Sequence, residues 1–229
     1  MTSAEPGSLP HSNHRPARPA VLHGYFRSSA AWRVRIALNL KSLTVTHVAH
    51  HLCRGEQRAP DYLALNPQGL VPALALDDGT VLTQSLAIIE YLDEAFPTPA
   101  LLPSDPVARA RVRAVALVFA ADTHPLQNLK VLARLRQAGW AEDAVQAWAA
   151  EANVAGLTAA ETLLAHTPDP FCFGDRPTLA DICLVPQLGS ARRFGVDVAR
   201  VPRLLAAEGA CLALPAFADA APGRQPDAE

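Results

Sequence analysis

The sequence predicts two domains of different class, an α/β domain followed by an all-α domain. Segments with strand and helix patterns alternate over residues 20–96, as in a sheet that is covered by helices. A proline-rich stretch at residues 97–106 then indicates a domain boundary. Beyond it alanine dominates and the strand patterns disappear, so the second domain is expected to consist of helices alone.

The first domain begins with a β-α-β pattern. Residues 20–26 are apolar, β-branched and aromatic, which predicts a strand. Apolar side chains recur at helical spacing over residues 30–41, and valines alternate with polar residues over 44–52, as in a second strand. A loop and a short helix at residues 59–65 are predicted to follow.

A hairpin and a helix complete the first domain. Asp78-Gly79 is a turn pair between two apolar runs, so residues 70–83 predict a hairpin. Residues 84–96 form an amphipathic helical pattern that ends before Pro97. A β-α-β unit followed by a β-β-α unit makes a four-stranded mixed sheet with helices on both faces, which is a thioredoxin-like arrangement.

Three long helices are predicted in the second domain, at residues 107–124, 141–166 and 178–194. Thr178, with Asp181 three residues later, predicts a capping box at the start of the last one. The predicted division of the chain is a disordered extension at 1–19, a thioredoxin-like domain at 20–98, an all-helical domain at 99–222 and a flexible tail at 223–229.

Composition and charge exclude several classes of function. The 229 residues carry a formal net charge of −2, so we expect no nucleic-acid partner. No apolar run approaches the roughly 18 residues that a membrane-spanning helix needs, and the N-terminal segment lacks the apolar core of a secretory signal. The cysteines form no C-x-x-C pair, which favours a reduced cytoplasmic protein without structural zinc. They are Cys53, Cys172, Cys183 and Cys211.

The stretch YFRSSAAWRVRIAL places Arg27, Ser28 and Ser29 at the start of the first predicted helix. Taken alone, two serines at this position predict an N-cap, because their hydroxyls accept hydrogen bonds from free backbone N–H groups. A helix N-terminus and nearby donors also lower the pKa of a thiol, so a hydroxyl here can stabilise a thiolate that another molecule brings. The residues by themselves leave both interpretations open.

Five motifs fall in order along the chain: FRSSAAWRVRIALNLK, NPQGLVPAL, QSLAIIEYLDE, PTPALLPSDP and HPLQNLKVL. Together with the predicted pair of domains, they resemble the zeta class of the soluble glutathione transferases, the maleylacetoacetate and maleylpyruvate isomerases. The resemblance covers about residues 20–222. One position departs from the family pattern, since Ala30 stands where the family usually has a cysteine.

The resemblance implies that glutathione is the cofactor and that the first domain binds it. Ser28 is expected to donate to the glutathione thiolate, with Ser29 as the second candidate. The backbone of Val71, before a cis bond to Pro72, is expected to pair with the cysteinyl part of glutathione like an added strand. The change to Ala30 is expected to tune this site without abolishing it, because the nucleophilic thiol is borrowed.

The two ends of glutathione carry charges. The resemblance implies that Gln84 and Ser85 hold the γ-glutamyl end of glutathione. They are predicted at a helix N-terminus, where free backbone N–H groups bind carboxylates. We expect His51 at the glycine carboxylate, with three alternatives left open, namely His50, Arg54 and Gln57. The run HVAHH also invites a metal interpretation, but no cysteine or carboxylate completes a ligand set. His124 and Asn128 of HPLQNLKVL are expected to reach glutathione from the second domain.

Substrates of the family are cis-enediones or cis-enoates with two acidic groups, so the resemblance implies cations in the substrate site. Arg27 and Arg193 are expected to clamp carboxylates, and Lys130 is a third candidate. Without the family, a solvated helix face is the simpler interpretation of Arg193. The implied reaction is addition of the thiolate to the cis double bond, rotation about the resulting single bond, and loss of the thiolate to give the trans isomer. Ser28, Ser29 and Arg27 are the predicted catalytic residues.

Several alternatives stay open. The same scaffold serves glutathione-dependent dehalogenases of α-haloacids and non-catalytic glutathione-binding modules. Thiol–disulfide exchange is set aside because the predicted active helix has no cysteine and Cys53 lies outside it. His124 favours maleylpyruvate, but the sequence does not decide between it and maleylacetoacetate, nor does it give residues 1–20 a role. The family implies a homodimer that acts in the breakdown of aromatic compounds.

Overall fold

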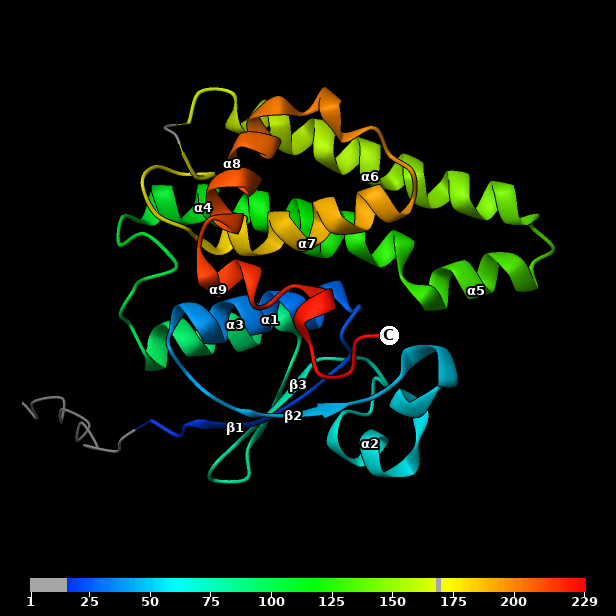
Figure 1. Cartoon of the computed structure of the whole chain (residues 1–229), viewed down its shortest axis with the longest axis horizontal. Helices are drawn as coiled ribbons and strands as arrows, with labels where there is room; N and C mark the ends of the chain where they lie inside the picture. The colour runs from blue at the N-terminus through cyan, green and yellow to red at the C-terminus, as the bar shows by residue number, and fades with distance from the viewer. Residues whose placement is uncertain (1–15, 168–169) are drawn as a thin grey trace, which may run out of the picture.

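The first domain is built on a four-stranded sheet in the computed structural model, which describes residues 16–167 and 170–229 (Figure 1). The strands are β1 (Pro19–Gly24), β2 (Thr46–Ala49), β3 (Ala73–Leu76) and β4 (Val81–Thr83), in the spatial order β2-β1-β3-β4. β1 runs parallel to β2 and antiparallel to β3, and β3 pairs with β4 in antiparallel register. The predicted mixed sheet is confirmed, and residues 1–15 of the predicted extension lie outside the described residues.

The turn between β3 and β4 is the predicted Asp78-Gly79 pair. Gly79 has a φ of 87°, in the left-handed region that glycine adopts without a steric penalty. The Asp78 carboxylate accepts a hydrogen bond from the Thr80 N–H at 2.9 Å, which fixes the turn. The hairpin register then pairs Ala75 with Val81. Local sequence is therefore sufficient to predict this connection.

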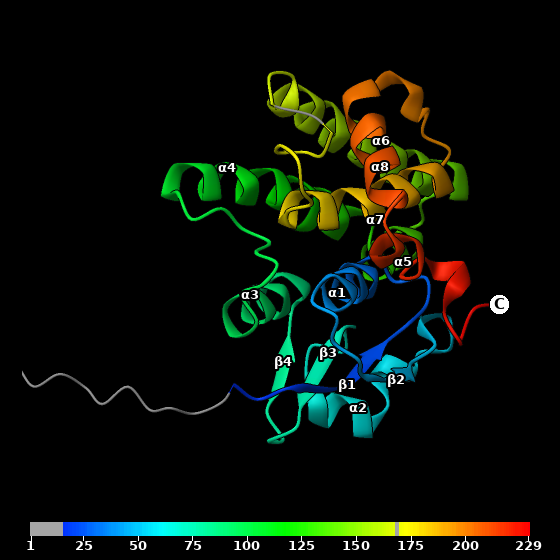
Figure 2. The same cartoon turned by 60° about the vertical axis from the view of Figure 1, so that its left-hand side comes forward.

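Three helices belong to the first domain: α1 (Ser29–Leu40), α2 (Pro60–Leu65) and α3 (Ser85–Ala95). α1 and α3 lie between the sheet and the helical domain, whereas α2 lies on the other side of the sheet (Figures 1 and 2). α1 is buried on more than one side, because Val34 and Ile36 leave the helix in different directions and both are fully buried. The same packing places the side chains of Arg33 and Arg35 in the interior.

The second domain is built from helices in the part of the chain that the structure describes. They are α4 (Pro106–Leu117), α5 (Leu129–Gln137), α6 (Glu142–Leu164), α7 (Leu179–Arg193), α8 (Pro202–Leu212) and α9 (Pro215–Ala218). The three long predicted helices correspond to α4, α6 and α7, while α5, α8 and α9 were not predicted. Asp181 accepts a hydrogen bond from the Thr178 N–H at 2.8 Å, and the predicted capping box is confirmed. Among the described residues, every helix is too short or too polar to cross a membrane.

The helix predicted over residues 107–124 changes character before its end. Its parts are α4 up to Leu117, a π-helical turn η3 (Val118–Thr123) and the start of a 3₁₀ turn η4 (His124–Gln127). Pro125 explains the break, since its nitrogen has no hydrogen to donate to the preceding turn. The Thr123 hydroxyl donates to the Val118 carbonyl at 2.7 Å. π-Helical turns are frequent at functional sites, and this one directly precedes His124.

The two domains share one hydrophobic core. A large cluster of buried side chains runs from the sheet through α1 into α7 and α8. α7 crosses α1 closely at Gly189, where an added Cβ would lie 2.9 Å from the Trp32 ring, so only glycine fits without a shift. At the end of α1, Lys41 donates to Asp93 at 2.7 Å and to the Pro99 carbonyl at 2.5 Å. These bonds tie the helix to α3 and to the linker between the domains.

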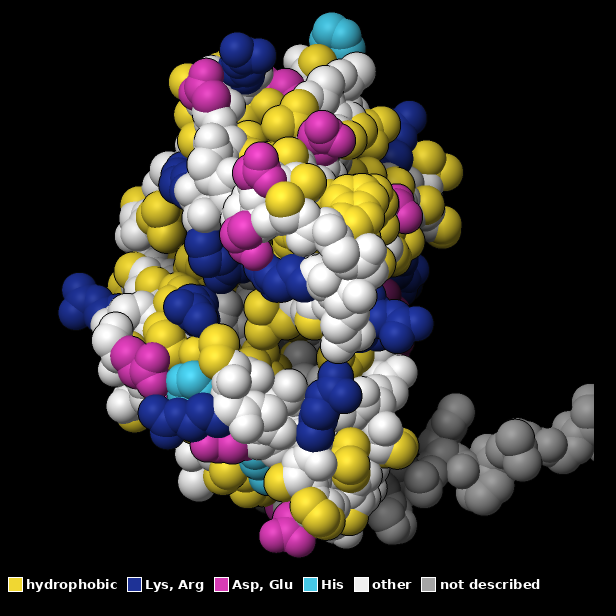
Figure 3. Space-filling model, turned by 90° about the vertical axis from the view of Figure 1, so that its right-hand side faces the viewer, with side chains coloured by type: hydrophobic (Ala, Val, Ile, Leu, Met, Phe, Trp, Pro, Cys, Tyr) yellow, Lys and Arg dark blue, Asp and Glu magenta, His cyan; other side chains and the backbone are white. Residues whose placement is uncertain are grey.

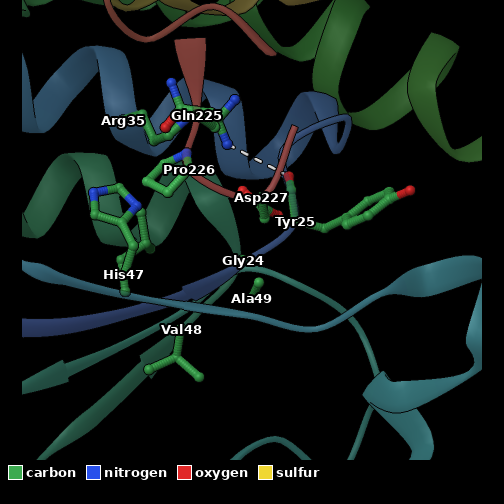
Figure 4. A pocket seen from close by; sticks show the side chains of 10 residues that line it. Gly24, Tyr25, Arg35, His47, Val48, Ala49, Gln225, Pro226 and Asp227 are labelled. Carbon is green, nitrogen blue, oxygen red and sulfur yellow. Dashed lines mark hydrogen bonds between the residues drawn. The ribbon is translucent and has the colours of Figure 1, made fainter. Parts of the chain in front are cut away.

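The C-terminal segment returns to the first domain. After α9, the chain passes through a 3₁₀ turn η6 (Pro222–Arg224) and crosses α1 toward β2 (Figure 1). Asp227 accepts a hydrogen bond from the Phe26 N–H at 2.9 Å, and a small hollow remains between this segment, Arg35 and the end of β1 (Figure 4). The predicted flexibility of residues 223–229 stays a prediction, and their described position is against the first domain.

Candidate active site

The two serines of the predicted site begin α1 at the boundary between the domains. Ser28 is the N-cap, and its Oγ accepts a hydrogen bond from the Ala31 N–H at 3.2 Å. That bond uses a lone pair, so the hydroxyl hydrogen of Ser28 can be donated to an external acceptor such as a thiolate. Ser29 donates its hydroxyl hydrogen to the Pro186 carbonyl of α7 at 3.5 Å. The geometry fits Ser28 better than Ser29 to the role of donor, and capping and donation are compatible in Ser28.

Arg27 precedes the serines and is exposed. Its guanidinium lies 6.0 Å from the Tyr25 ring centroid and 5.8 Å from that of Phe26, within the range of a cation–π contact. One of its N–H groups also donates to the Cys53 Sγ at 3.5 Å. Cys53 lies outside α1, as expected, but the turn η1 (Leu52–Arg54) brings its thiol beside Arg27. No periodic pattern in the sequence predicts this contact.

Arg193 is the last residue of α7 and approaches the same place from the second domain. Its guanidinium donates to the Ser190 hydroxyl at 3.0 Å and lies 5.4 Å from the Phe194 ring centroid. Burial of the guanidinium end and the positive charge of Arg27 both lower the pKa of Arg193. Within the described residues, the ion pairs include neither of these two arginines. Figure 3 shows a hollow between the domains with Lys and Arg side chains on its rim, which suits an anionic ligand.

A buried polar network lies behind Arg193. The Ser190 hydroxyl donates to Gln127 Oε1 at 2.9 Å, and the Asn153 amide donates to the same oxygen at 2.6 Å. Gln187 extends the network by donating to Asn153 Oδ1 at 2.7 Å. Hydrogen bonds among buried groups in a low dielectric favour one arrangement, so this network fixes the end of α7 against η4. Sequence patterns do not predict this network, because its residues lie far apart in the chain.

His124 begins η4 and meets a buried arginine of the first domain. Arg33 Nη2 lies 3.1 Å from His124 Nδ1, and Arg33 Nη1 donates to the Ser85 hydroxyl at 3.4 Å. Burial, and then the charges of Arg33 and Arg193, lower the pKa of His124 to about 3, so the imidazole is neutral near pH 7. Arg33 was not among the predicted site residues, although the sequence holds a signal for its burial. Arg33 and Arg35 lie about 200° apart around a helix, so a packed helix must bury at least one of them.

The start of α3 holds the pair predicted for the γ-glutamyl end of glutathione. Gln84 has a φ of 69°, a conformation that costs a non-glycine residue about 1–3 kcal/mol and is concentrated at functional sites. Its amide donates to Gln68 Oε1 at 2.8 Å, while Ser85 is buried at the first position of the helix. The bond between Val71 and Pro72 is cis, as the resemblance implies.

The candidates for the glycine carboxylate separate in the structure. His51 Nε2 lies 2.9 Å from a carboxylate oxygen of Glu229, and the Arg54 guanidinium lies 3.6 Å from the same oxygen. His50 stacks on His23, with ring nitrogens 3.0 Å apart, and burial lowers the pKa of His50. A carboxylate therefore fits between His51 and Arg54, whereas His50 is engaged elsewhere.

The remaining predicted residues keep their roles as predictions. Asn128 is the N-cap of α5 and accepts a hydrogen bond from the Lys130 N–H at 3.1 Å, while the Lys130 side chain is exposed. Gln57 Oε1 is buried, and no described group donates to it. Ala30 is half-buried beside the serines. The described residues contain no cluster of three or more His, Cys, Asp or Glu side chains that is able to hold a metal ion.

Family models match both domains. The model of the glutathione S-transferase N-terminal domain matches residues 27–95, and that of the glutathione S-transferase C-terminal domain matches residues 142–209. Among curated relatives, the maleylacetoacetate isomerase of Pseudomonas aeruginosa is 51% identical over 208 residues. The aligned part covers 90% of this chain and 97% of the relative.

Solved structures share the whole two-domain fold. One is the holo structure of a maleylpyruvate isomerase, a bacterial glutathione S-transferase of the zeta class, with a TM-score of 0.89 and 47% identity over 91% of this chain and 100% of that chain. Another is the maleylacetoacetate isomerase of Methylobacterium extorquens AM1 with bound malonate and glutathione. It has a TM-score of 0.89 and 43% identity, and the match covers 92% of this chain and 100% of that chain. The chain described here therefore belongs to the glutathione S-transferases, within the zeta class that contains the maleylacetoacetate and maleylpyruvate isomerases.

Proposed function

We propose that this chain is a glutathione-dependent cis–trans isomerase of a maleyl-type dicarboxylic acid, either maleylacetoacetate or maleylpyruvate. One observation carries the proposal. Arg27 and Arg193 come from different domains, lie close enough to act on each other, and have no described carboxylate partner. Guanidinium groups bind carboxylates in bidentate geometry, so the pair suits a substrate with two acidic groups. The names of the relatives support the same reaction.

Glutathione fits the donor set of the first domain. Ser28 offers a hydroxyl hydrogen at the N-terminus of α1, where the helix dipole and free N–H groups favour a thiolate. The other proposed contacts are Gln84 and Ser85 for the γ-glutamyl end, the backbone of Val71 for the cysteinyl part and His51 for the glycine carboxylate. When bound, glutathione supplies a thiolate that adds reversibly to the cis double bond and thereby allows rotation about it.

The side chains of the second domain hold the substrate and stabilise the charge that forms on it. Arg193, opposite Arg27, is proposed to bind one of the two carboxylates. Negative charge moves to a conjugated carbonyl oxygen during the reaction, so cations fixed in advance lower the barrier. His124 is a neutral imidazole near pH 7 and serves as a hydrogen-bonding group toward glutathione. Asn128 is proposed to contact glutathione, and Lys130 to contact the substrate.

The proposed setting is the cytoplasm, where the enzyme acts as a homodimer in the breakdown of aromatic compounds. All four cysteines are free thiols, which suits a reducing compartment. Val107 and Leu117 of α4 leave 60% and 44% of their surface exposed, and we propose that they lie in the contact between the subunits. Opening of an aromatic ring is the class of reaction that delivers a cis-unsaturated diacid to such an enzyme.

The test follows the ultraviolet absorbance of maleylpyruvate and maleylacetoacetate in separate assays, with and without glutathione. We expect the cis isomer to disappear only when glutathione is present, and to disappear faster for the preferred substrate. Ser28→Ala and Arg193→Ala are expected to remove most of this activity. The control is Arg200→Ala in the turn η5 (Val198–Arg200), where the arginine side chain is 85% exposed, and it should leave the rate unchanged.

Absence of turnover of both compounds, together with measurable glutathione binding, refutes the isomerase proposal. Release of halide from α-haloacids in the presence of glutathione then identifies a dehalogenase. No reaction with either class of substrate leaves a glutathione-binding module without catalysis, since the fold alone does not fix the function.

A further inference from the structure

Arg33 is a buried cation that no described carboxylate neutralises. It lies in the middle of α1 with 2% of its surface exposed. Its hydrogen-bond partners are neutral groups, the Ser85 hydroxyl at 3.4 Å and His124 Nδ1 at 3.1 Å. Burial lowers the pKa of Arg33, but a guanidinium keeps its charge near neutral pH. A buried charge without a counter-charge is costly, so its position calls for an explanation beyond packing.

The contact with His124 fixes the tautomer of the imidazole. A guanidinium has only N–H donors and no acceptor, so His124 Nδ1 accepts the hydrogen bond and carries no hydrogen. The proton of the neutral ring then lies on Nε2. The charged groups that act on the ring are Arg33 from α1 and Arg193 from α7, and both oppose a second proton. His124 is therefore held as a neutral ring that donates through Nε2.

The contact with Ser85 acts in the same direction. The Ser85 oxygen accepts the hydrogen bond from Arg33, so its own hydroxyl hydrogen is directed to another acceptor. Ser85 begins α3 of the first domain, whereas His124 begins η4 of the second. One guanidinium thus orients donors at the start of two elements, and His124 lies 91 positions beyond Arg33 in the chain.

We propose that Arg33 is a positioning residue of the glutathione site, which aligns the Ser85 hydroxyl and presents His124 as a donor through Nε2. The identity of the ligand rests on the proposed function, whereas the tautomer follows from the geometry alone. In this arrangement, the positive charge of Arg33 attracts the carboxylate of the bound ligand. Ser85 is the proposed contact of the γ-glutamyl end, so the carboxylate of that end supplies the counter-charge that the described residues lack.

The tautomer can be measured on the unmodified chain without any ligand. Histidine labelled with nitrogen-15 is incorporated, and the ring nitrogens of His124 are identified by comparison with His124→Gln. We expect a hydrogen on Nε2 alone, unchanged between about pH 5 and pH 8, because the ring stays neutral. A hydrogen on Nδ1, or titration near the ordinary value of about 6.5, overturns the proposal.

The positioning role is tested by measuring glutathione binding calorimetrically. Arg33→Lys keeps the charge but loses the fork that reaches both partners. We expect the Kd for glutathione to rise about tenfold to hundredfold, as for the loss of hydrogen bonds from a charged group. Arg113→Met in α4 is the matched control, since Arg113 pairs with Glu90 outside the candidate site, and it should leave the Kd unchanged.

Measuring Arg33→Lys in a His124→Gln chain distinguishes a positioning role of Arg33 from a general loss of structure. If Arg33 acts through His124, then Arg33→Lys weakens binding much less in a His124→Gln chain than in the unmodified one, because coupled residues are not additive. Additive effects, or an unchanged Kd for Arg33→Lys, overturn the proposal. The histidine spectrum of the unmodified chain decides the tautomer even if the variants fold poorly. None of these measurements uses an isomerase substrate, so their failure is distinct from failure of the proposed function.

Discussion

Two buried arginines of α1, Arg33 and Arg35, lie two residues apart and are held by different kinds of partner. Arg35 donates to three backbone carbonyls: those of Ala220 at 3.0 Å, Tyr25 at 3.4 Å and Phe26 at 2.9 Å. Figure 4 shows the bond to Tyr25. Arg35 therefore joins the C-terminal segment to the loop that precedes α1. Burial lowers the pKa of Arg35 to about 10, which leaves it charged near neutral pH.

Arg33 contacts a hydroxyl and an imidazole instead of the backbone. It lacks a described carboxylate partner, whereas the charge of Asp227 acts on Arg35 and opposes the lowering of its pKa. A backbone carbonyl accepts a hydrogen bond but has no hydrogen to donate. The carbonyls bound to Arg35 therefore pass no hydrogen bond on to a further group. A hydroxyl or a neutral imidazole passes a hydrogen on to a further group. The partners thus distinguish an arginine that joins backbone segments from one that we propose to serve a site.

The largest expected effect follows from removing Arg35. Arg35→Met leaves the carbonyls of Ala220 and Phe26 without a described donor, while the Tyr25 carbonyl keeps its bond from the Ser28 N–H at 3.0 Å. We expect the free energy of unfolding to fall by about 3–5 kcal/mol. Arg33→Met removes a charge that has no counter-charge, and its cost is expected to stay below about 1 kcal/mol. Urea unfolding of both variants measures the difference. A greater loss for Arg33→Met than for Arg35→Met would contradict the comparison.

Arg193 extends the comparison to the second domain, because its hydrogen bond also goes to a hydroxyl. Arg193→Ala is expected to reduce kcat/KM for the maleyl substrate by about tenfold to a hundredfold, with little change in stability, since a charged hydrogen bond to the substrate is lost. Steady-state kinetics with saturating glutathione measures this. Ser190→Ala, which removes only the hydroxyl that orients Arg193, should have a smaller effect. Equal kcat/KM for Arg193→Ala and the unmodified chain would show that Arg193 does not bind substrate.

The pH dependence of stability tests the burial of His124 first, and then the charges of Arg33 and Arg193 that act on it. The unfolded chain takes up a proton on His124 near its ordinary pKa of 6.5, whereas the folded chain does so only near a pKa of about 3. The contribution of His124 to stability is therefore complete above pH 6.5 and is lost as the pH falls through this window, by up to about 1.4 kcal/mol per pH unit. Urea unfolding at several pH values should show a shallower dependence for His124→Gln. The same dependence in both chains would mean that the folded protein protonates His124 normally.

The smallest expected effect concerns the carboxylate beside Arg35. Asp227→Asn keeps an oxygen that accepts from the Phe26 N–H but removes the charge. Because backbone carbonyls hold Arg35, we expect a loss of only about 0.5–1 kcal/mol in the free energy of unfolding. Thermal or urea unfolding of the variant at low salt measures it. A loss as large as that of Arg35→Met would show that Arg35 depends on this carboxylate.

The sequence was a good guide wherever a structural feature is set by residues close together in the chain. Asp78-Gly79 forms its turn because the carboxylate and the positive φ of glycine act within a few residues. Thr178 and Asp181 form their capping box for the same reason. The break after Leu117 was not predicted, although Pro125 was visible. Proline removes one donor, but this does not specify that the chain forms a π turn.

The residues of the candidate site show the same difference between features set by near neighbours and features set by distant contacts. The motif FRSSAAWRVRIALNLK located Ser28 at the start of a helix, and the helical pattern over residues 178–194 located Arg193 near the end of another. Neither pattern revealed that Cys53 lies beside Arg27, or that Arg33 reaches His124. Helical spacing says which side of an element a residue faces, but not which element will cover that side.

The sequence by itself determined the order and type of the strands and of the long helices, and the family of the chain. Only the tertiary structure decided how the halves meet, for example the hydrogen bond between Phe26 and Asp227, 201 positions apart. Helix periods, caps and turns depend on energies between near neighbours, so they can be read along the chain. Contacts between distant residues depend on how packed elements cross, and at α1 and α7 this depends on the fit of Trp32 against Gly189.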